Sequence, residues 1–423
     1  MFILIRKGRV INPSSNTDGI MDVLIHDHIV EDISPDINHD ADIIIDADGK
    51  LVLPGLIDIH VHFRQPGRED IETIRKGAGV AAAGGFTTVC VMPNTTPPPD
   101  CPEQIGFVLD EAKASCIEVL PVATITKGRK GEELSDMKIL SDCGACAFSD
   151  DGSPVSLPDV MRAALIESDN LGKPLLAHEE DFSLVNGGSI HQGTVSSSLG
   201  IKGIPRDAEE AMIRRDIDLA KRHGGILHVQ HLSSGGSAGI IRNAQSEGIR
   251  VTCETAPHYF SLTDEAVRTH GSNAKMNPPL REETDRRAII EALRDGTIDI
   301  IATDHAPHLA KDKSKSIESA PFGIIGLETS IPLVITKLVR EEGFSYLDAF
   351  RKMTINPATL LGIDRGSIQK GKRADITIID PDQQITVSEE SIISDCKNTP
   401  FLGMKLFGKV LYTISNGSIV FKG

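Results

Sequence analysis

The chain lacks a hydrophobic run long enough to cross a membrane, and it has too few basic residues to balance its acidic ones. Its 423 residues include 44 Lys and Arg against 60 Asp and Glu, which gives a formal net charge of −16. Such an acidic chain is a poor candidate for binding nucleic acid or an anionic membrane. The charges at the N-terminus follow its apolar residues, the reverse of a secretory signal. We therefore expect a soluble, cytoplasmic protein, in which any anionic substrate would require local cations.

A paired cysteine framework is also lacking. The seven cysteines are an odd number and are scattered along the chain. Cys143 and Cys146 form one C-x-x-C, but no second pair follows to complete a zinc ribbon. This usage is typical of reduced thiols in the cytosol.

Two β-rich ends flank a different middle. Residues 1–53 and 366–423 contain short apolar runs separated by Asn, Pro, Ser and Gly clusters, without helix-period stretches. We predict that these two ends form one small β-sandwich domain. Residues 54–365 would then be a separate catalytic domain.

The middle of the chain alternates between strand and helix patterns. Eight strand candidates lie at 56–62, 86–92, 118–124, 145–149, 174–178, 226–231, 250–255 and 298–303. Repeated βα units predict a parallel sheet, and eight of them fit a TIM-type (β/α)8 barrel of the metallo-dependent hydrolase kind. The alternative is an open doubly wound sheet, which the lack of a G-x-G-x-x-G after the first strand disfavours.

Polar residues end most of these strands, where a barrel carries its chemistry. His60 and His62 close the first strand, and residues i and i+2 of a strand share one face. Four later strands end in further metal-ligand types: Asp150 and Asp151, His178, His231, and Asp304. One H-x-H is a weak signal, but a barrel brings these ends to one cavity, so we predict a metal site there.

The ligand types favour zinc. They are imidazole and carboxylate without thiolate, which suits Zn²⁺, with Mn²⁺, Co²⁺ or Fe²⁺ as substitutes. Their number exceeds the need of one tetrahedral ion, and two ions bridged by a hydroxide would use them all. The implied chemistry is hydrolysis, or its reverse, at an amide-like carbon. Alternation alone does not decide whether Asp150 or Asp151 bridges.

The motifs resemble those of a known family. Residues 54–62 and 371–376 resemble signatures of the amidohydrolase superfamily. Within it the chain is similar, over essentially its whole length, to the class I, long-chain bacterial dihydroorotases. The more specific motifs lie at 60–67, 92–95, 148–152, 303–308 and 321–328.

This resemblance implies roles for the metal-site residues. His60 and His62 would bind the buried metal, and His178 and His231 the second. Asp151 would bridge both ions together with a hydroxide. Asp304 would bind the first metal and act as general base and acid.

The resemblance also implies a substrate site. The residues expected there are His62, Arg64, Asn94, Asn277, His308, Phe322 and Gly323. Arg64, Asn94 and His308 would hold a substrate carboxylate, while Asn277 and the backbone of Phe322 and Gly323 would grip the ring. The planar fork of Arg64 matches a carboxylate, although a surface ion pair is the alternative. The polar segment 309–319 is either a mobile lid or an ordinary surface loop.

The implied activity is the reversible, zinc-dependent cyclisation of N-carbamoyl-L-aspartate to (S)-dihydroorotate, the third step of de novo pyrimidine biosynthesis. One alternative is a hydantoinase or allantoinase, but those relatives bridge their metals with a carboxylated lysine at the end of strand 4, and residues 144–151 contain no lysine. The other is a non-catalytic partner of aspartate carbamoyltransferase, which would have lost metal ligands. We further expect a homodimer, with association with aspartate carbamoyltransferase as an open alternative.

Overall fold

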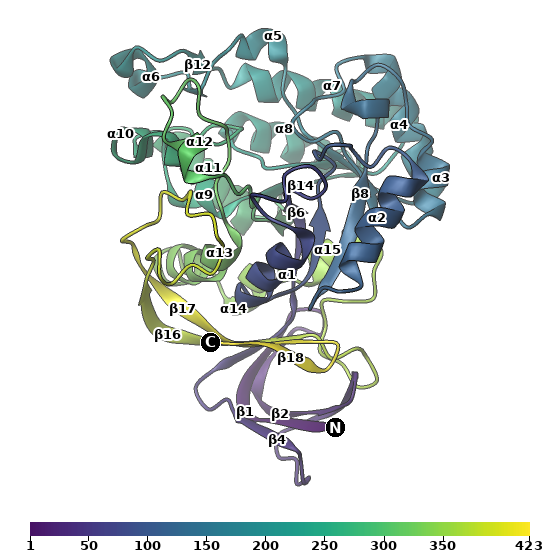
Figure 1. Cartoon of the computed structure of the whole chain (residues 1–423), viewed down its shortest axis with the longest axis vertical. Helices are drawn as coiled ribbons and strands as arrows, with labels where there is room; N and C mark the ends of the chain where they lie inside the picture. The colour runs from purple at the N-terminus through teal and green to yellow at the C-terminus, as the bar shows by residue number, and fades with distance from the viewer.

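The computed structural model describes residues 1–423 and contains two large β-sheets, one of which lies below the other in Figure 1. One sheet, drawn in purple and yellow, is built from both ends of the chain. The other is the wall of a barrel surrounded by helices. The expected combination of a barrel and a β unit from both termini is confirmed.

The barrel wall has eight parallel strands that neighbour one another in chain order. They are β6 (Leu56–Val61), β7 (Phe86–Val91), β8 (Glu118–Ala123), β9 (Ala147–Phe148), β10 (Leu175–Ala177), β13 (Leu227–Val229), β14 (Val251–Thr255) and β15 (Ile300–Ile301). A parallel bridge between Val61 and His305 joins the first strand to the chain just after the last one. Each strand lies within one of the eight predicted ranges, because fully buried parallel strands are continuous apolar runs.

Helices separate the strands and cover the outside of the barrel. They are α1 (Ile74–Ala83), α2 (Pro102–Ala112), α3 (Met137–Asp142), α4 (Pro158–Leu171), α7 (Asp207–His223), α8 (Gly235–Ser246), α11 (Glu283–Arg294), α13 (Leu327–Leu333), α14 (Tyr346–Arg351) and α15 (Ile355–Leu361). A π-helical stretch, Val334–Glu341, continues α13. In α7, acidic residues in the first turn and basic residues in the last complement the helix dipole.

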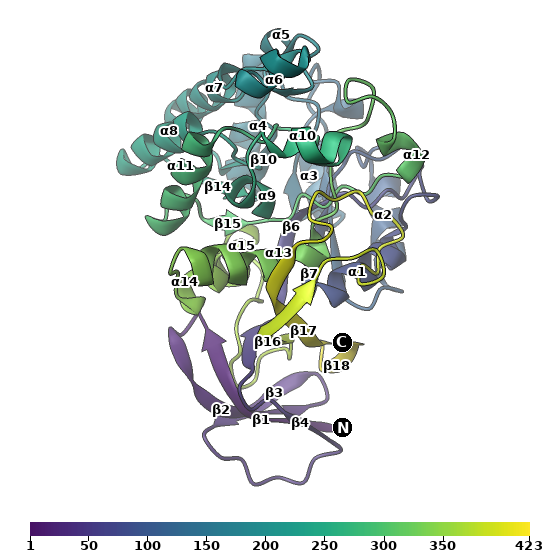
Figure 2. The same ribbon diagram turned by 90° about the vertical axis from the view of Figure 1, so that its left-hand side faces the viewer.

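Short elements extend the loops at the end of the barrel away from the terminal sheet (Figure 2). They are α5 (Phe182–Val185), β11 (Ile190–His191), α6 (Thr194–Leu199), β12 (Gly203–Ile204), α9 (Pro257–Ser261), α10 (Ala266–His270) and α12 (Ala310–Lys313), with 3₁₀ turns at Lys127–Arg129 and Gly271–Ala274. No helix has both the length and the apolar character that a membrane span requires.

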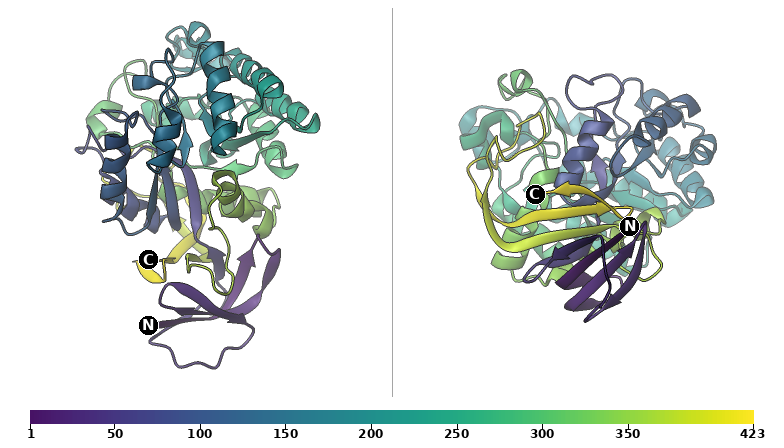
Figure 3. Two further views of the ribbon diagram at one scale, coloured as in Figure 1. Left: turned by 90° about the vertical axis from the view of Figure 1, so that its right-hand side faces the viewer. Right: turned by 60° about the horizontal axis from the view of Figure 1, so that its bottom comes forward.

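The terminal sheet has strand order β18-β17-β16-β5-β1-β2-β3, with β4 paired to β1. Its members are β1 (Phe2–Asn12), β2 (Thr17–His26), β3 (Ile29–Ser34), β4 (Ile43–Asp46), β5 (Leu51–Pro54), β16 (Ile376–Thr386), β17 (Lys405–Ser415) and β18 (Ser418–Lys422). Antiparallel pairing of β5 with β16 joins the two ends of the chain, and Figure 3 shows both sets of strands from below. The division at 1–53, 54–365 and 366–423 stays a prediction.

Candidate functional site

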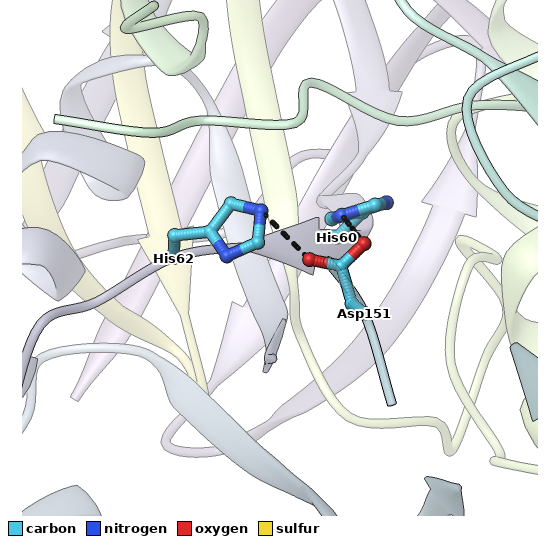
Figure 4. Close-up of side chains that lie close together, drawn as sticks. All are labelled: His60, His62 and Asp151. Carbon is cyan, nitrogen blue, oxygen red and sulfur yellow. Dashed lines mark ion pairs between the residues drawn. The ribbon is translucent and has the colours of Figure 1, made fainter. Parts of the chain in front are cut away.

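The pair of histidines that ends β6 faces one carboxylate. Asp151, three residues beyond β9, places Oδ1 3.5 Å from Nε2 of His60 and Oδ2 3.5 Å from Nε2 of His62. Figure 4 shows this carboxylate between the two rings. From beyond β15, Asp304 places Oδ1 2.9 Å from Nε2 of His62 and 3.6 Å from Nε2 of His60.

A second pair of histidines lies close to the same carboxylate of Asp151. Nδ1 of His178 and Nε2 of His231 lie 3.4 Å and 3.5 Å from Asp151 Oδ1. These two ring nitrogens are 2.8 Å apart. Two groups with metal-ligand geometry therefore share Asp151: one with His60 and His62, the other with His178 and His231.

The donor set fits divalent cations. Nε2 of His60 is fully buried and has no hydrogen-bond partner in the protein. A buried polar atom without a partner destabilises a fold unless a ligand satisfies it. Imidazole nitrogens and carboxylate oxygens that converge on shared points are the ligands such an ion requires. The chain therefore has the residues of a metal centre.

The two neighbouring aspartates have different surroundings. Oδ1 of Asp150 accepts hydrogen bonds from the backbone N–H groups of Ile125, at 2.9 Å, and Thr126, at 3.1 Å. The Asp150 carboxylate is thus hydrogen-bonded to the loop after β8. Burial raises the pKa of Asp150 to about 6. Burial also acts to raise the pKa of Asp151, but the surrounding histidines lower it well below its usual value. The structure thus places Asp151, and not Asp150, among the histidines.

Hydrogen-bond acceptors orient three of the rings. Oε1 of Glu254, on β14, lies 2.6 Å from Nδ1 of His60, and Oδ1 of Asn94 lies 2.9 Å from Nδ1 of His62. Oε2 of Glu180 lies 3.0 Å from Nε2 of His178. A proton held on the nitrogen that faces the acceptor leaves the other nitrogen free to bind a metal.

Sequence reasoning missed Glu254 and Glu180. Glu254 is an acidic residue within the buried strand β14, where a charge needs a partner. Glu180 follows His178 by two residues, the same spacing as between His60 and His62. Both signals are readable in the sequence, but neither identifies the histidine that the carboxylate contacts.

A polar cavity of about 270 Å³ opens beside this cluster. Its lining residues are His62, Arg64, Asn94, Asp151, Gly152, His178, His231, Asn277, Asp304, Ala306, His308, Phe322 and Gly323. All predicted metal and substrate residues except His60 are among them. His60 is fully buried behind the cavity wall.

Arg64 supplies a positive charge to this cavity. Its guanidinium contacts the carbonyl oxygen of Pro307 at 3.3 Å and Nε2 of His308 at 3.4 Å, and it forms no salt bridge. Desolvation lowers the pKa of Arg64 to about 10, so the group stays charged at neutral pH. Burial and the charge of Arg64 lower the pKa of His308 to about 3, so that ring is neutral. The surface ion pair that was the alternative for Arg64 is therefore not formed.

A turn formed by Phe322 and Gly323 makes up another part of the cavity wall, and Gly323 adds no side chain to it. Nε2 of His308 donates to the carbonyl oxygen of Phe322 at 2.7 Å. Gly323 has φ +117°, and a Cβ there would lie 2.6 Å from Cβ of Ala306. Only glycine fits this position, because both the conformation and the space exclude a side chain. Asn277, which is expected to bind the substrate ring, donates from Nδ2 to Oε2 of Glu180 at 2.9 Å. The same oxygen of Glu180 faces Nε2 of His178.

The segment 309–319 is attached to the same wall. It contains α12, and Nζ of the buried Lys313 donates to the carbonyl oxygens of Lys275 at 3.3 Å, Pro321 at 3.0 Å and Gly323 at 2.9 Å. The segment therefore supports the turn at Gly323 in the structure.

A (β/α)8 barrel with four histidines and two aspartates at its strand ends, beside a polar cavity, defines the metal-dependent amidohydrolase class. Family models agree: residues 49–237 match "Dihydro-orotase-like" and residues 276–421 match "Amidohydrolase family". The chain belongs to the dihydroorotase family and is a cyclic amide hydrolase. Relatives named dihydroorotase include those of Geobacter metallireducens, 48% identical over all of both chains, and Acetivibrio thermocellus, 46% identical over 99% of this chain and 98% of that one.

Solved structures show the same fold. An L-hydantoinase (dihydropyrimidinase) from Arthrobacter aurescens superimposes with a TM-score of 0.90 at 28% identity, over 100% of this chain and 96% of that one. A dihydropyrimidinase from Brevibacillus agri superimposes with a TM-score of 0.87 at 23% identity, over 100% and 95%. The predicted family resemblance is confirmed at the level of dihydroorotases and amidohydrolases.

Proposed function

We propose that this chain is a class I dihydroorotase that interconverts N-carbamoyl-L-aspartate and (S)-dihydroorotate in pyrimidine synthesis. The observation that carries the substrate assignment is Arg64, a charged guanidinium in the cavity without a carboxylate partner. Both proposed substrates bear carboxylates, and Arg binds a carboxylate with two parallel hydrogen bonds. In a chain of net charge −16, such a local cation is the feature that an anionic substrate requires.

The proposed cofactor is a pair of zinc ions. His60, His62 and Asp304 would hold the first, His178 and His231 the second, and Asp151 would bridge them. Nitrogen and oxygen ligands without thiolate favour zinc among the common metals. Bound zinc would polarise the reacting carbonyl group and activate water as the nucleophile.

Asp304 is the proposed general base and acid. Burial acts to raise its pKa, but His62 and His60 lower it below its usual value, so Asp304 is ionised and able to accept a proton. In ring opening it would take the proton of the attacking water and give it to the ring nitrogen as the C–N bond breaks. In ring closure the same proton would move in the opposite direction.

Substrate binding is assigned to the remaining residues of the cavity wall. Arg64, Asn94 and His308 would hold the carboxylate, and His62 lies beside them. Asn277 and the backbone at Phe322 and Gly323 would hold the ring. Glu180 accepts from Nδ2 of Asn277, so the amide oxygen and the second N–H of Asn277 are left for the substrate.

Two alternatives have weaker support. A hydantoinase with a carboxylated lysine is disfavoured, because both groups of potential metal ligands share Asp151 and the strand before it contains no lysine. A non-catalytic scaffold is disfavoured, because all six proposed ligands converge. A homodimer, an association with aspartate carbamoyltransferase and a cytoplasmic location stay predictions.

The test is turnover of dihydroorotate, hydantoin and allantoin by one purified preparation, with metal analysis of the same sample. We expect ring opening of dihydroorotate, ring closure of N-carbamoyl-L-aspartate, and zinc in the protein. Opening of hydantoin or allantoin without opening of dihydroorotate would overturn the proposal.

A further inference from the structure

The C-terminal part of the chain contributes to the active-site end of the barrel. Between β16 and β17 it leaves the terminal sheet over residues 387–404, here called the excursion, which lies beside α13 (Figure 1, yellow). Several of its apolar side chains are in the barrel core: Val387, Ile392, Cys396 and Phe401. The carboxylate of Glu328, on α13, accepts from the backbone N–H groups of Ile393 at 2.6 Å and Ser394 at 3.2 Å. The excursion is therefore firmly packed against the barrel.

One buried side chain of the excursion, Asn398, reaches the back of the cavity wall. It is 4% exposed. Its Nδ2 donates to the carbonyl oxygens of Ala306 at 2.9 Å and Gly323 at 3.2 Å. Its Oδ1 accepts from the backbone N–H of His308 at 3.0 Å. The amide thus uses both of its donors and its acceptor on one wall of the cavity.

Those three partners come from two neighbouring segments of the wall, which are also joined by a hydrogen bond from the backbone N–H of Ala306 to the carbonyl oxygen of Ile324 at 2.7 Å. Ala306 and His308 follow β15, whereas Gly323 belongs to the turn that closes the cavity. The backbone of Asn398 adds a fourth contact, because its carbonyl oxygen accepts from the N–H of Ile325 at 3.0 Å. A residue about ninety positions from His308 in the sequence therefore reinforces the direct contact between Nε2 of His308 and the carbonyl oxygen of Phe322.

We infer that Asn398 is a positioning residue of the substrate site, which sets His308 and the Phe322–Gly323 turn at the separation that the substrate needs. The inference rests on the proposed function, because that function assigns the substrate carboxylate and ring to this wall. Asn398 is not among the residues that line the cavity, so it acts through its backbone contacts.

An amide is the group that this position requires. An aspartate of the same shape would keep the acceptor for His308 but would place an oxygen against two carbonyl oxygens. An alanine would leave the carbonyl oxygen of Ala306 and the backbone N–H of His308 without partners in a buried place, whereas the carbonyl oxygen of Gly323 would keep Lys313 Nζ at 2.9 Å. The conservative change Asn398→Asp is therefore the more specific probe, and Asn398→Ala is the broader one.

The experiment compares both variants with a matched control, Asn12→Ala. Asn12 is also buried, at 3% exposure, and its Nδ2 donates to the carbonyl oxygen of Ile368 at 2.8 Å, but it lies in the terminal sheet. KM, kcat, zinc content and melting temperature are measured for each purified chain. We expect KM for dihydroorotate to rise at least tenfold in both Asn398 variants, with kcat reduced less and zinc content unchanged. Asn12→Ala should lose stability without a change in KM.

A merely structural role for Asn398 predicts a different result. The inference is overturned if the Asn398 variants lose stability as Asn12→Ala does while KM stays within twofold of the wild type. It is equally overturned if kcat and zinc content fall while KM does not change. Where a variant does not fold, Asn398→Ser, which retains a small hydrogen-bonding group, takes its place.

Failure of the proposed function can be distinguished from failure of this inference, because it would be seen in the turnover of the wild-type protein. A wild-type chain that opens hydantoin but not dihydroorotate removes the proposed substrate. The Asn398 comparison is then made with hydantoin, whose ring would contact the same wall, and an unchanged KM for hydantoin overturns the positioning role.

Discussion

Nδ1 of His60 lies 2.6 Å from Oε1 of Glu254, although the two residues are 194 positions apart in the sequence. Glu254 therefore fixes the orientation of a ring whose other nitrogen faces Asp151. Carboxylates that orient metal-binding histidines typically contribute about 10–100-fold to metal affinity.

We expect Glu254→Gln to weaken zinc binding by about 10–100-fold, because a neutral amide holds the imidazole proton less strongly. Competition with a chelator measures the dissociation constant. The matched control is Glu72→Gln, which alters a buried histidine–carboxylate pair, His305–Glu72 at 3.2 Å, outside the metal cluster. Equal zinc affinity in Glu254→Gln and the wild type would remove the orienting role.

The two-ion arrangement predicts a metal count. A chelator should abolish turnover, and zinc should restore it as two equivalents per chain are taken up. His178→Ala should retain about one equivalent, because the group of His60, His62 and Asp151 is intact. Asp151→Ala should lose both, since each group uses that carboxylate. Atomic emission on desalted protein gives the counts, and a single equivalent in the wild type would contradict the arrangement.

Asp304→Asn should reduce turnover by about 10²–10⁴-fold, because an amide cannot accept the proton of the attacking water. The fold should survive, since an asparagine side chain has nearly the same size and shape as the aspartate that it replaces. The check is kcat together with zinc content and melting temperature. Turnover like that of the wild type would exclude Asp304 as the general base.

Arg64→Ala should raise KM for dihydroorotate by about 10–100-fold, the loss expected for hydrogen bonds to a charged group. Arg64→Lys should restore binding only in part, because a lysine lacks the planar fork. The control is Arg68→Ala, since Arg68 is an exposed neighbour paired with Asp70 at 2.9 Å and should have no effect. An unchanged KM in Arg64→Ala would place the carboxylate elsewhere.

Asp264→Asn should stabilise the protein at neutral pH. Burial, with repulsion from Glu282 and Glu265, raises the pKa of Asp264 from 3.8 to about 6, and Oδ2 has no hydrogen-bond partner. Between those two values the folded chain binds more protons than the unfolded chain, so its stability falls as the pH rises. The gain at pH 7 is at most about 3 kcal/mol and should vanish below pH 3.8. Melting temperatures of both proteins across pH 3.5–8 test this, and a pH-independent difference would contradict it.

Much of the barrel was predictable because its strands are buried on both faces and stand out as apolar runs between helix-period segments. The ligands His60, His62, His178, His231 and Asp304 could be proposed for the same reason, since each follows such a run. β11 and β12 were not predicted, because two-residue strands leave no periodic pattern.

The contacts between distant segments could not be predicted. Nothing in the local sequence of Asn398 indicates His308 or Gly323 as partners, because a single buried amide has no periodic signature. The same holds for Lys313, whose amine reaches three carbonyl oxygens that support the cavity wall.

The sequence by itself determined the class of fold, the ligand types and the family, because periodicity and short motifs are local properties of the chain. Only the tertiary structure decided that Asp151 and not Asp150 faces the histidines, since the backbone N–H groups of Ile125 and Thr126 donate hydrogen bonds to the carboxylate of Asp150. Only the tertiary structure also left Arg64 without a carboxylate partner and brought Asn398 to the cavity wall. Those outcomes depend on which distant groups are available for pairing, and packing alone settles that.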